Sequence, residues 1–174
     1  MSNQTNTKRL TVCAMLAALG VVLLWIGSIL EVAEISMAVI ASLLCVVAVI
    51  EYGGVAPWLV FAATGALGLI LLPNKGIAVT YLLFFGYYPI IKEKIERRTR
   101  GGRWVLKELI FHVALIALAA VWKWLLMPTA EMPSTILLVA FLVLCEVVFV
   151  LYDVALTRLI SFYMFRLRQR FRWK

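Results

Sequence analysis

The sequence predicts an all-α integral membrane protein, and three observations lead to this fold class. Hydrophobic residues occupy 64% of the 174 positions, charged residues only 15%, and the mean hydropathy is +1.00. The apolar residues form long runs without strict alternation, which favours membrane helices over the strands of a membrane barrel. Short polar or basic segments separate these runs. The composition therefore excludes an ordinary soluble domain, in which about half of the residues are apolar.

Six apolar runs approach or exceed the length of about 20 helical residues that crosses a bilayer core. The expected spans are residues 10–30, 35–50, 55–72, 76–91, 104–126 and 134–162. Because they occupy almost the whole chain, we expect a single transmembrane domain over residues 1–174, ending in a basic cytoplasmic tail at residues 163–174.

Local signals support the individual elements. The run that follows Lys8 and Arg9 is longer than the apolar region of a signal peptide, so we interpret it as the first span. Pro57 suits the start of the third span, and the sequence PNKG at residues 73–76 suits a tight turn before the fourth. Pro89 interrupts the fourth span near its end, and an amphipathic basic segment follows it at the membrane interface.

The distribution of basic residues predicts the orientation. With six spans and both termini in the cytoplasm, all 17 lysines and arginines except Lys75 and Lys123 lie on the cytoplasmic side. Those two lie at the outer ends of spans, where a long side chain can reach water. We therefore expect a multi-pass protein of the cell (plasma) membrane, with membrane lipids around it, and we interpret the net charge of +8 as a topology signal with no nucleic-acid partner.

Small residues on the first span form a candidate docking face. Ala14, Ala17 and Ala18 follow the i, i+3, i+4 spacing that lets a second helix approach closely in lipid. Packing inside this chain is the alternative interpretation. The third span has a similar stretch at residues 62–68, where internal packing is the favoured interpretation.

Ionisable residues within spans are rare and are functional candidates by default. His112 is expected in the fifth span at a depth close to that of Glu146 in the sixth, and Asp153 lies on the same helical face as Glu146. A contact between His112 and Glu146 would satisfy both side chains. A structural clamp between the two helices is the favoured interpretation, and a proton relay is the alternative.

The outer ends of the spans offer a candidate ligand site, because only this end combines aromatic side chains with a few polar groups. The candidate residues are Trp25, Glu31, Glu34, Asn74, Lys75, Trp122 and Lys123. An interfacial aromatic belt is the alternative interpretation. We expect no enzymatic activity, no metal site and no cofactor, because the sequence contains one histidine and none of the common nucleophile, metalloprotease or P-loop motifs.

One family resemblance combines several of these features. The sequence TKRL at residues 7–10, followed by AMLAALGVVL at residues 14–23, resembles the first helix of the substrate-binding S components of energy-coupling factor transporters. Ala14 and Ala18 match the AxxxA pattern of that helix. A looser similarity follows, in the apolar helix at residues 35–50 and the sequence EYGGVAP at residues 51–57.

The resemblance implies a six-helix bacterial bundle that captures a vitamin-like nutrient at the outer face. It implies partners as well: a transmembrane coupling subunit, which would dock on Ala14 and Ala18, and two ABC-type ATPases. The alternative is a non-transport scaffold of cell-envelope assembly, similar in size to the small rod-shape-determining membrane protein. A proton-coupled carrier acting alone is a third and less favoured possibility, because the sequence shows no inverted repeat.

Overall fold

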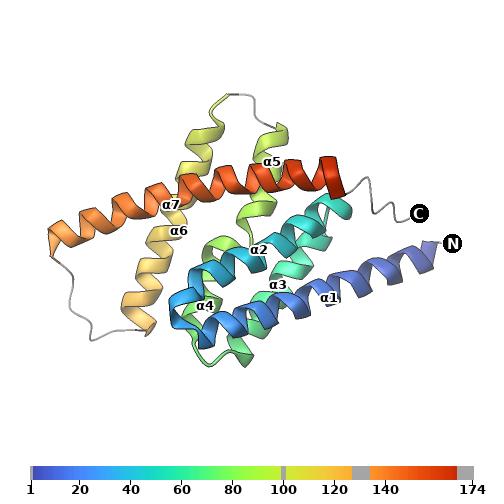
Figure 1. Ribbon diagram of the computed structural model, residues 1–174, viewed down its shortest axis with the longest axis horizontal. Coiled ribbons are helices and arrows are strands. Elements are labelled where there is room, and N and C mark those ends of the chain that lie inside the picture. Colours follow the sequence, from blue (N-terminus) through green and yellow to red (C-terminus); the bar gives the residue numbers. More distant parts are fainter. Residues whose placement is uncertain (1, 99–100, 127–133, 168–174) are drawn as a thin grey trace. The chain divides into compact units, whose positions relative to one another are not determined.

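The computed structural model describes residues 2–98, 101–126 and 134–167, and within these residues the chain forms helices and no strands (Figure 1). The predicted all-α class is therefore confirmed for this part of the chain. In order, the elements are α1 Ser2–Ile29, η1 Glu31–Ala33, α2 Glu34–Glu51, α3 Ala56–Leu71, α4 Lys75–Thr80, η2 Tyr81–Phe85, α5 Tyr88–Arg98, α6 Arg103–Val121, η3 Trp122–Leu126, α7 Thr135–Phe162 and η4 Tyr163–Leu167. The element η1 is a 3-10 turn, and η2, η3 and η4 are π-helical.

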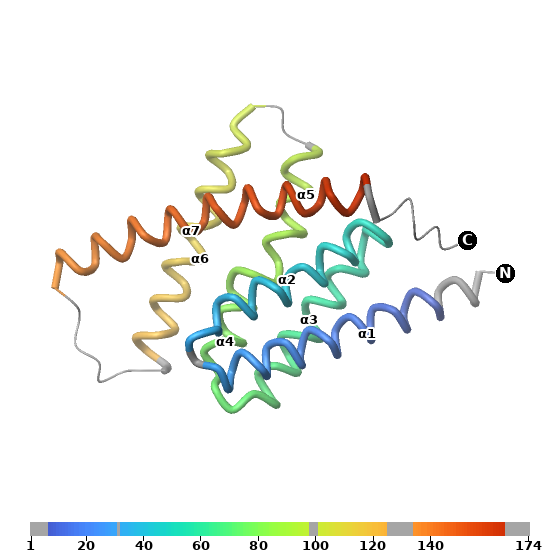
Figure 2. Tube along the Cα trace, viewed as in Figure 1, coloured from blue at the N-terminus to red at the C-terminus, as the bar shows by residue number. Residues whose placement is uncertain are grey.

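The chain divides into two compact units, Met1–Pro128 and Thr129–Lys174, and the structure defines the arrangement within each. The first unit contains α1 to α6, and the second contains α7 and η4. In the first unit α1 lies along both α2 and α3, which also contact each other (Figure 2). Helix α5 contacts α2 and α6. The single transmembrane domain expected from the sequence stays a prediction.

Among the residues that the structure describes, four helical segments are long and apolar enough to cross a membrane. They are Thr7–Ile29, Glu34–Glu51, Arg103–Trp124 and Thr135–Phe165. Helix α3 is apolar but has only 16 residues. The described helices are thus compatible with a membrane protein, while the number of six spans and the cytoplasmic position of both termini stay predictions.

The segment expected as the fourth span is not one regular helix. Helix α4 passes into the π-helix η2, where the Gly86 N–H donates to the Tyr81 carbonyl at 2.7 Å, five residues back. A new helix, α5, begins at Tyr88. Because Pro89 has no N–H, it cannot donate to the carbonyl four residues earlier, and a regular helix cannot continue through it unbroken. Pro89 instead occupies the first turn of α5, the position that proline tolerates best.

The turn between α2 and α3 is built by two consecutive glycines. Gly53 and Gly54 have φ values of 58° and 57°, in the left-handed region that favours glycine at the end of a helix. The N–H groups of Tyr52 and Gly53 both donate to the Ala48 carbonyl at 3.1 Å. Pro57 lies in the first turn of α3, as the sequence predicts. These residues end α2 and start α3 within a few positions.

Small residues bring α1 and α3 close together. The Thr64 hydroxyl of α3 donates to the Ala17 carbonyl of α1 at 3.4 Å. A Cβ atom added to Gly20 would lie 2.9 Å from Thr64 Cγ2, closer than real side chains approach. The two helices can therefore approach this closely only because position 20 has no side chain.

Large apolar side chains remain exposed along the candidate spans. Met15 on α1, Val113 on α6 and Leu151 on α7 are each exposed over more than half of their surface. In water such surfaces promote association, whereas in a bilayer they face lipid tails of similar polarity. The exposed surface is therefore of the kind that a lipid environment accommodates.

Candidate binding site around Asn74

Asn74 joins three elements of the first unit. Its backbone N–H donates to the Ser28 hydroxyl near the end of α1 at 3.0 Å, and its side-chain Nδ2 donates to Glu34 Oε1 at the start of α2. Its Oδ1 accepts from the Gly76 N–H at 2.9 Å, which makes Asn74 the N-cap of α4. Asn74 and Glu34, both predicted to bind a ligand, are thus brought into direct contact.

Lys75 interacts with the end of α3. Its ammonium group donates to the Leu72 carbonyl at 2.6 Å and to the Ile70 carbonyl at 3.3 Å. The last carbonyls of a helix lack partners within the helix and form its negative end, so a lysine ammonium is a favourable cap there. The predicted ligand residue Lys75 therefore has a structural role in this arrangement.

Trp122 lies against the residue that Asn74 caps. A Cβ atom added to Gly76 would lie 3.4 Å from Trp122 Cζ2, so the edge of the indole rests against the backbone at the start of α4. Gly76 itself is buried, and Trp122 is about two-fifths exposed. Glu34, Asn74 and Trp122 together form what we call the Asn74 cluster.

The other predicted ligand residues have looser relations to the Asn74 cluster. Trp25 is about half exposed on α1, one turn before Ser28. Lys123 follows Trp122 in η3 and is partly exposed. The side chain of Glu31 lies outside the described part of the structure. Their participation in a ligand site stays a prediction.

The Asn74 cluster combines a carboxylate with an aromatic edge. Asn74 uses both of its side-chain atoms within the protein, as an acceptor for Gly76 and as a donor to Glu34. The amide therefore positions the Glu34 carboxylate, while the Trp122 indole lies against Gly76, two residues after Asn74. Such a combination suits a small ligand with hydrogen-bond donors and an apolar ring.

The three predicted docking residues divide between two faces of α1. Ala17 is buried, and its carbonyl accepts from Thr64. Ala14 and Ala18 are exposed. Ala17 therefore belongs to the internal packing of the first unit, and only Ala14 and Ala18 remain accessible to another helix.

The predicted intramembrane polar residues lie on α6 and α7. His112 Nδ1 is 2.9 Å from the Glu108 carbonyl on α6. Because a carbonyl only accepts, a hydrogen bond at this position requires the proton to be on Nδ1. Glu146 and Asp153 lie on α7, in the second unit, so the predicted contact between His112 and Glu146 stays a prediction.

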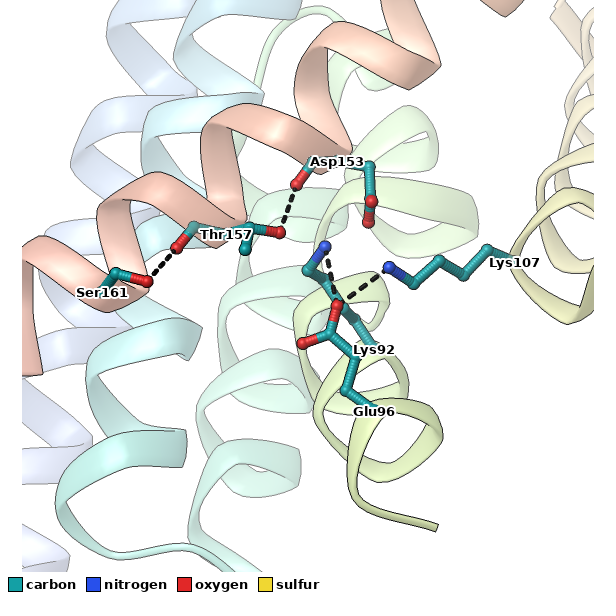
Figure 3. A network of polar contacts seen from close by, with 6 residues as sticks. All are labelled: Lys92, Glu96, Lys107, Asp153, Thr157 and Ser161. Carbon is teal, nitrogen blue, oxygen red and sulfur yellow. Dashed lines mark hydrogen bonds and ion pairs between the residues drawn. The ribbon is translucent and has the colours of Figure 1, made fainter. Parts of the chain in front are cut away.

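Helix α7 also carries a ladder of hydroxyl groups. The Thr157 hydroxyl donates to the Asp153 carbonyl and the Ser161 hydroxyl to the Thr157 carbonyl, both at 2.9 Å (Figure 3). Both bonds run from residue i to residue i−4 along one face of the helix. Serine and threonine hydroxyls are satisfied in this way inside apolar helices.

A charged cluster on α5 and α6 was not expected from the sequence. Lys92 and Lys107 both contact Glu96 Oε1, at 3.2 Å and 2.9 Å (Figure 3). The Lys92 side chain is 0% exposed, that of Lys107 7%, and that of Glu96 34%. Burial alone would raise the pKa of Glu96, but the hydrogen bonds and charges of Lys107 and Lys92 outweigh it and lower this pKa below its ordinary value.

Helical periodicity could have identified Lys92. In a helix, residues four before and three after a given position lie on the same face. For Lys92 these are Tyr88 and Ile95, and both are buried. A lysine on the apolar face of an amphipathic helix, four residues before a glutamate, indicates a buried ion pair. The interpretation of Lys92 as a charge that only sets the orientation in the membrane does not predict this pair.

Comparisons with known proteins give one finding: no protein-family model, no curated protein and no solved structure matches the chain.

Proposed function

We propose that this chain is the membrane-embedded substrate-binding subunit of a nutrient uptake system, in the manner of an energy-coupling factor S component. In this proposal it has six spans in the plasma membrane, with both termini in the cytoplasm. It binds a small vitamin-like nutrient at the outer face, and a separate coupling subunit with ABC-type ATPases drives transport. The observation that carries the proposal is the division of α1 into two faces.

Helix α1 uses one face for the fold and offers another to a partner. Cys13, Ala17 and Leu24 are buried, whereas Ala14 and Ala18 are exposed. Lipid tails contact a leucine at least as well as an alanine, so lipid exposure alone does not favour small residues at both positions. Two exposed alanines at AxxxA spacing suit the close approach of a helix from another subunit.

Charge separation within the first unit supports the orientation. The Arg9 guanidinium donates to the Gly53 carbonyl at 3.3 Å, which places Arg9 beside the turn between α2 and α3. The Asn74 cluster lies at the opposite ends of α1 and α2, near Ser28 and Glu34. With the positively charged end in the cytoplasm, the Asn74 cluster faces outward, where a nutrient would arrive.

The proposal is tested by copurification. The tagged protein is extracted from its native host in mild detergent, and the associated proteins are identified by mass spectrometry. Wild-type protein should bring a membrane subunit and ABC-type ATPases, and the double substitution Ala14→Leu and Ala18→Leu should reduce their recovery at least tenfold. Ala119→Leu, at an exposed position on α6, is the matched control and should leave the recovery unchanged.

Two outcomes contradict the proposal. If the double variant recovers as much ATPase as wild type, then α1 is not the docking face. Recovery of cell-envelope synthesis proteins in place of ATPases would favour the non-transport scaffold. Size-exclusion profiles of all variants show whether a loss of partners reflects a loss of fold.

A further inference from the structure

Basic side chains from two helices contact residues near the start of α3. Arg9 of α1 donates to the Gly53 carbonyl, three residues before α3 begins. Lys94 of α5 holds its ammonium 5.2 Å from the centre of the Trp58 ring, in the first turn of α3. Arg97 lies one turn after Lys94 and is 83% exposed. We call Arg9, Trp58, Lys94 and Arg97 the basic edge.

The segment that contributes to the basic edge is strongly positive. Residues 92–107 contain seven lysines and arginines and only two glutamates. One of these, Glu96, contacts the buried Lys92 and Lys107, and the other, Glu93, is 3.3 Å from Arg97. Neither glutamate is in contact with Lys94 in the described ion pairs. The segment therefore carries a net positive charge in sequence, and its exposed members Lys94 and Arg97 offer charge that complements an anion.

Two lysine ammonium groups lie over tryptophan rings in the first unit. Besides Lys94 over Trp58, the Lys107 ammonium lies 5.4 Å from the centre of the Trp104 ring, and Trp104 is about half exposed. Indole rings prefer the level of the lipid headgroups, and lysine side chains extend from there toward phosphate and water. The half-exposed Trp104 and the partly exposed Trp58 favour a lipid surface over a soluble polyanion, which would not require indoles at its surface. Lys107, which is buried against Glu96, adds no charge to that surface.

From these observations we infer that the basic edge binds the phosphate of anionic phospholipids at the membrane surface. Lys94 and Arg97 contact the phosphate, Arg9 adds charge from α1, and the Trp58 indole lies between headgroup and acyl chains. The inference requires that the chain is embedded in a membrane. It does not depend on the nutrient or on the coupling subunit.

The experiment uses the full-length protein in a neutral detergent and titrates phosphatidylglycerol or phosphatidylcholine while thermal unfolding is recorded. Phosphatidylglycerol should raise the Tm, and phosphatidylcholine should not. The double variant Lys94→Gln and Arg97→Gln should require about 25-fold more phosphatidylglycerol for the same shift, because each basic residue near an anionic surface contributes about a fivefold factor. Arg158→Gln, which removes an exposed arginine of α7, is the matched control and should respond like wild type.

Three results would overturn the inference. They are an equal Tm shift with both lipids, an unchanged response of the double variant, and an equal shift with soluble glycerol phosphate, which would indicate a site for free anions. Native mass spectrometry of lipids retained by wild type and double variant provides a second readout if the variant unfolds early. Copurification of ATPases is scored separately, so that failure of the proposed function and failure of this inference are distinguishable.

Discussion

At the scale of single residues, Glu96 holds together the charged cluster of α5 and α6. Two lysines with almost no exposed surface contact one of its oxygens. A buried ammonium that loses a charged hydrogen-bond partner is destabilising by about 1.5–3 kcal/mol. Partial exposure of Glu96 reduces that figure through solvent screening. We therefore expect Glu96 to contribute to stability rather than to ligand binding.

The first prediction concerns Glu96→Gln. Because the pKa of Glu96 is lowered in the folded protein, its stabilisation is complete above the ordinary carboxyl pKa of about 4.3 and is lost as the pH falls through the folded value. The variant should have about 1–2 kcal/mol less free energy of unfolding at pH 7. This difference from wild type should persist down to about pH 5 and shrink as the pH falls below about 4, through the lowered pKa of Glu96. Thermal unfolding in detergent between pH 7 and about pH 2 measures both effects.

Glu93→Gln is the matched control for this prediction. Glu93 pairs with Arg97, whose side chain is largely exposed, and such surface pairs contribute about 0–1 kcal/mol. A difference between wild type and Glu96→Gln that stays constant from pH 7 down to about pH 2 would show that the carboxylate charge is not the cause.

The candidate site shows how far residue types can be interpreted without a structure. Polar groups next to proline and glycine indicate a turn, and Asn74 does lie in one. The sequence does not reveal that Asn74 caps α4 and holds Glu34, because that depends on the meeting of α1, α2 and α4. Nor does it reveal that the Lys75 ammonium is directed to the carbonyls of α3. Charge and hydropathy locate such residues but do not identify their partners.

At the scale of elements, hydropathy predicts helix positions well and helix interruptions less well. Helices α2 and α3 begin and end within one residue of the expected ranges 35–50 and 55–72. The π-helix η2 could not be predicted, because its residues YLLFF are compatible with a regular helix. The break at Gly86 depends on Pro89 and on the packing of rings from neighbouring helices, which pattern analysis does not include.

The substitution Gly86→Ala tests the packing of aromatic rings against Gly86. A Cβ atom at position 86 would lie 2.5 Å from Phe61 Cδ2 and 2.8 Å from the Tyr81 ring. Aromatic rings in a packed interior cannot move aside without disturbing their neighbours, and Phe61 also contacts Tyr87. We expect a loss of about 1–3 kcal/mol in unfolding free energy, which is typical of overpacking, measured by thermal unfolding in detergent.

Gly101→Ala is the control for the break. A Cβ atom at Gly101 would meet nothing within 4 Å, so this substitution should change the Tm by less than 1 °C. Equal stability of Gly86→Ala and wild type would show that Phe61 and Tyr81 can rearrange and that the approach at Gly86 is not essential to the fold.

At the scale of the whole molecule, the difference between the two ends of the first unit connects the fold to the proposed function. One end carries the basic edge, and the other carries the Asn74 cluster. Helices α1 and α2 connect the two ends, since Arg9 and Ser28 belong to α1 and Glu34 begins α2. A nutrient-binding subunit needs this polarity, because its ligand arrives from outside and its ATPases lie in the cytoplasm.

The last prediction concerns which end of the first unit faces the outside of the cell, and it is tested by labelling single cysteines. Cys13, Cys45 and Cys145 are first replaced by alanine, and Lys75→Cys or Arg97→Cys is then introduced separately, because these two positions lie at opposite ends of the first unit. In intact cells a membrane-impermeant maleimide should label the Lys75→Cys protein within minutes. Arg97→Cys should react only after permeabilisation, because the end richer in lysine and arginine stays in the cytoplasm. The cysteine-free protein is the control for background labelling. Labelling of Arg97→Cys in intact cells would place the basic edge outside, and the Asn74 cluster could then not be the entry site of an imported nutrient.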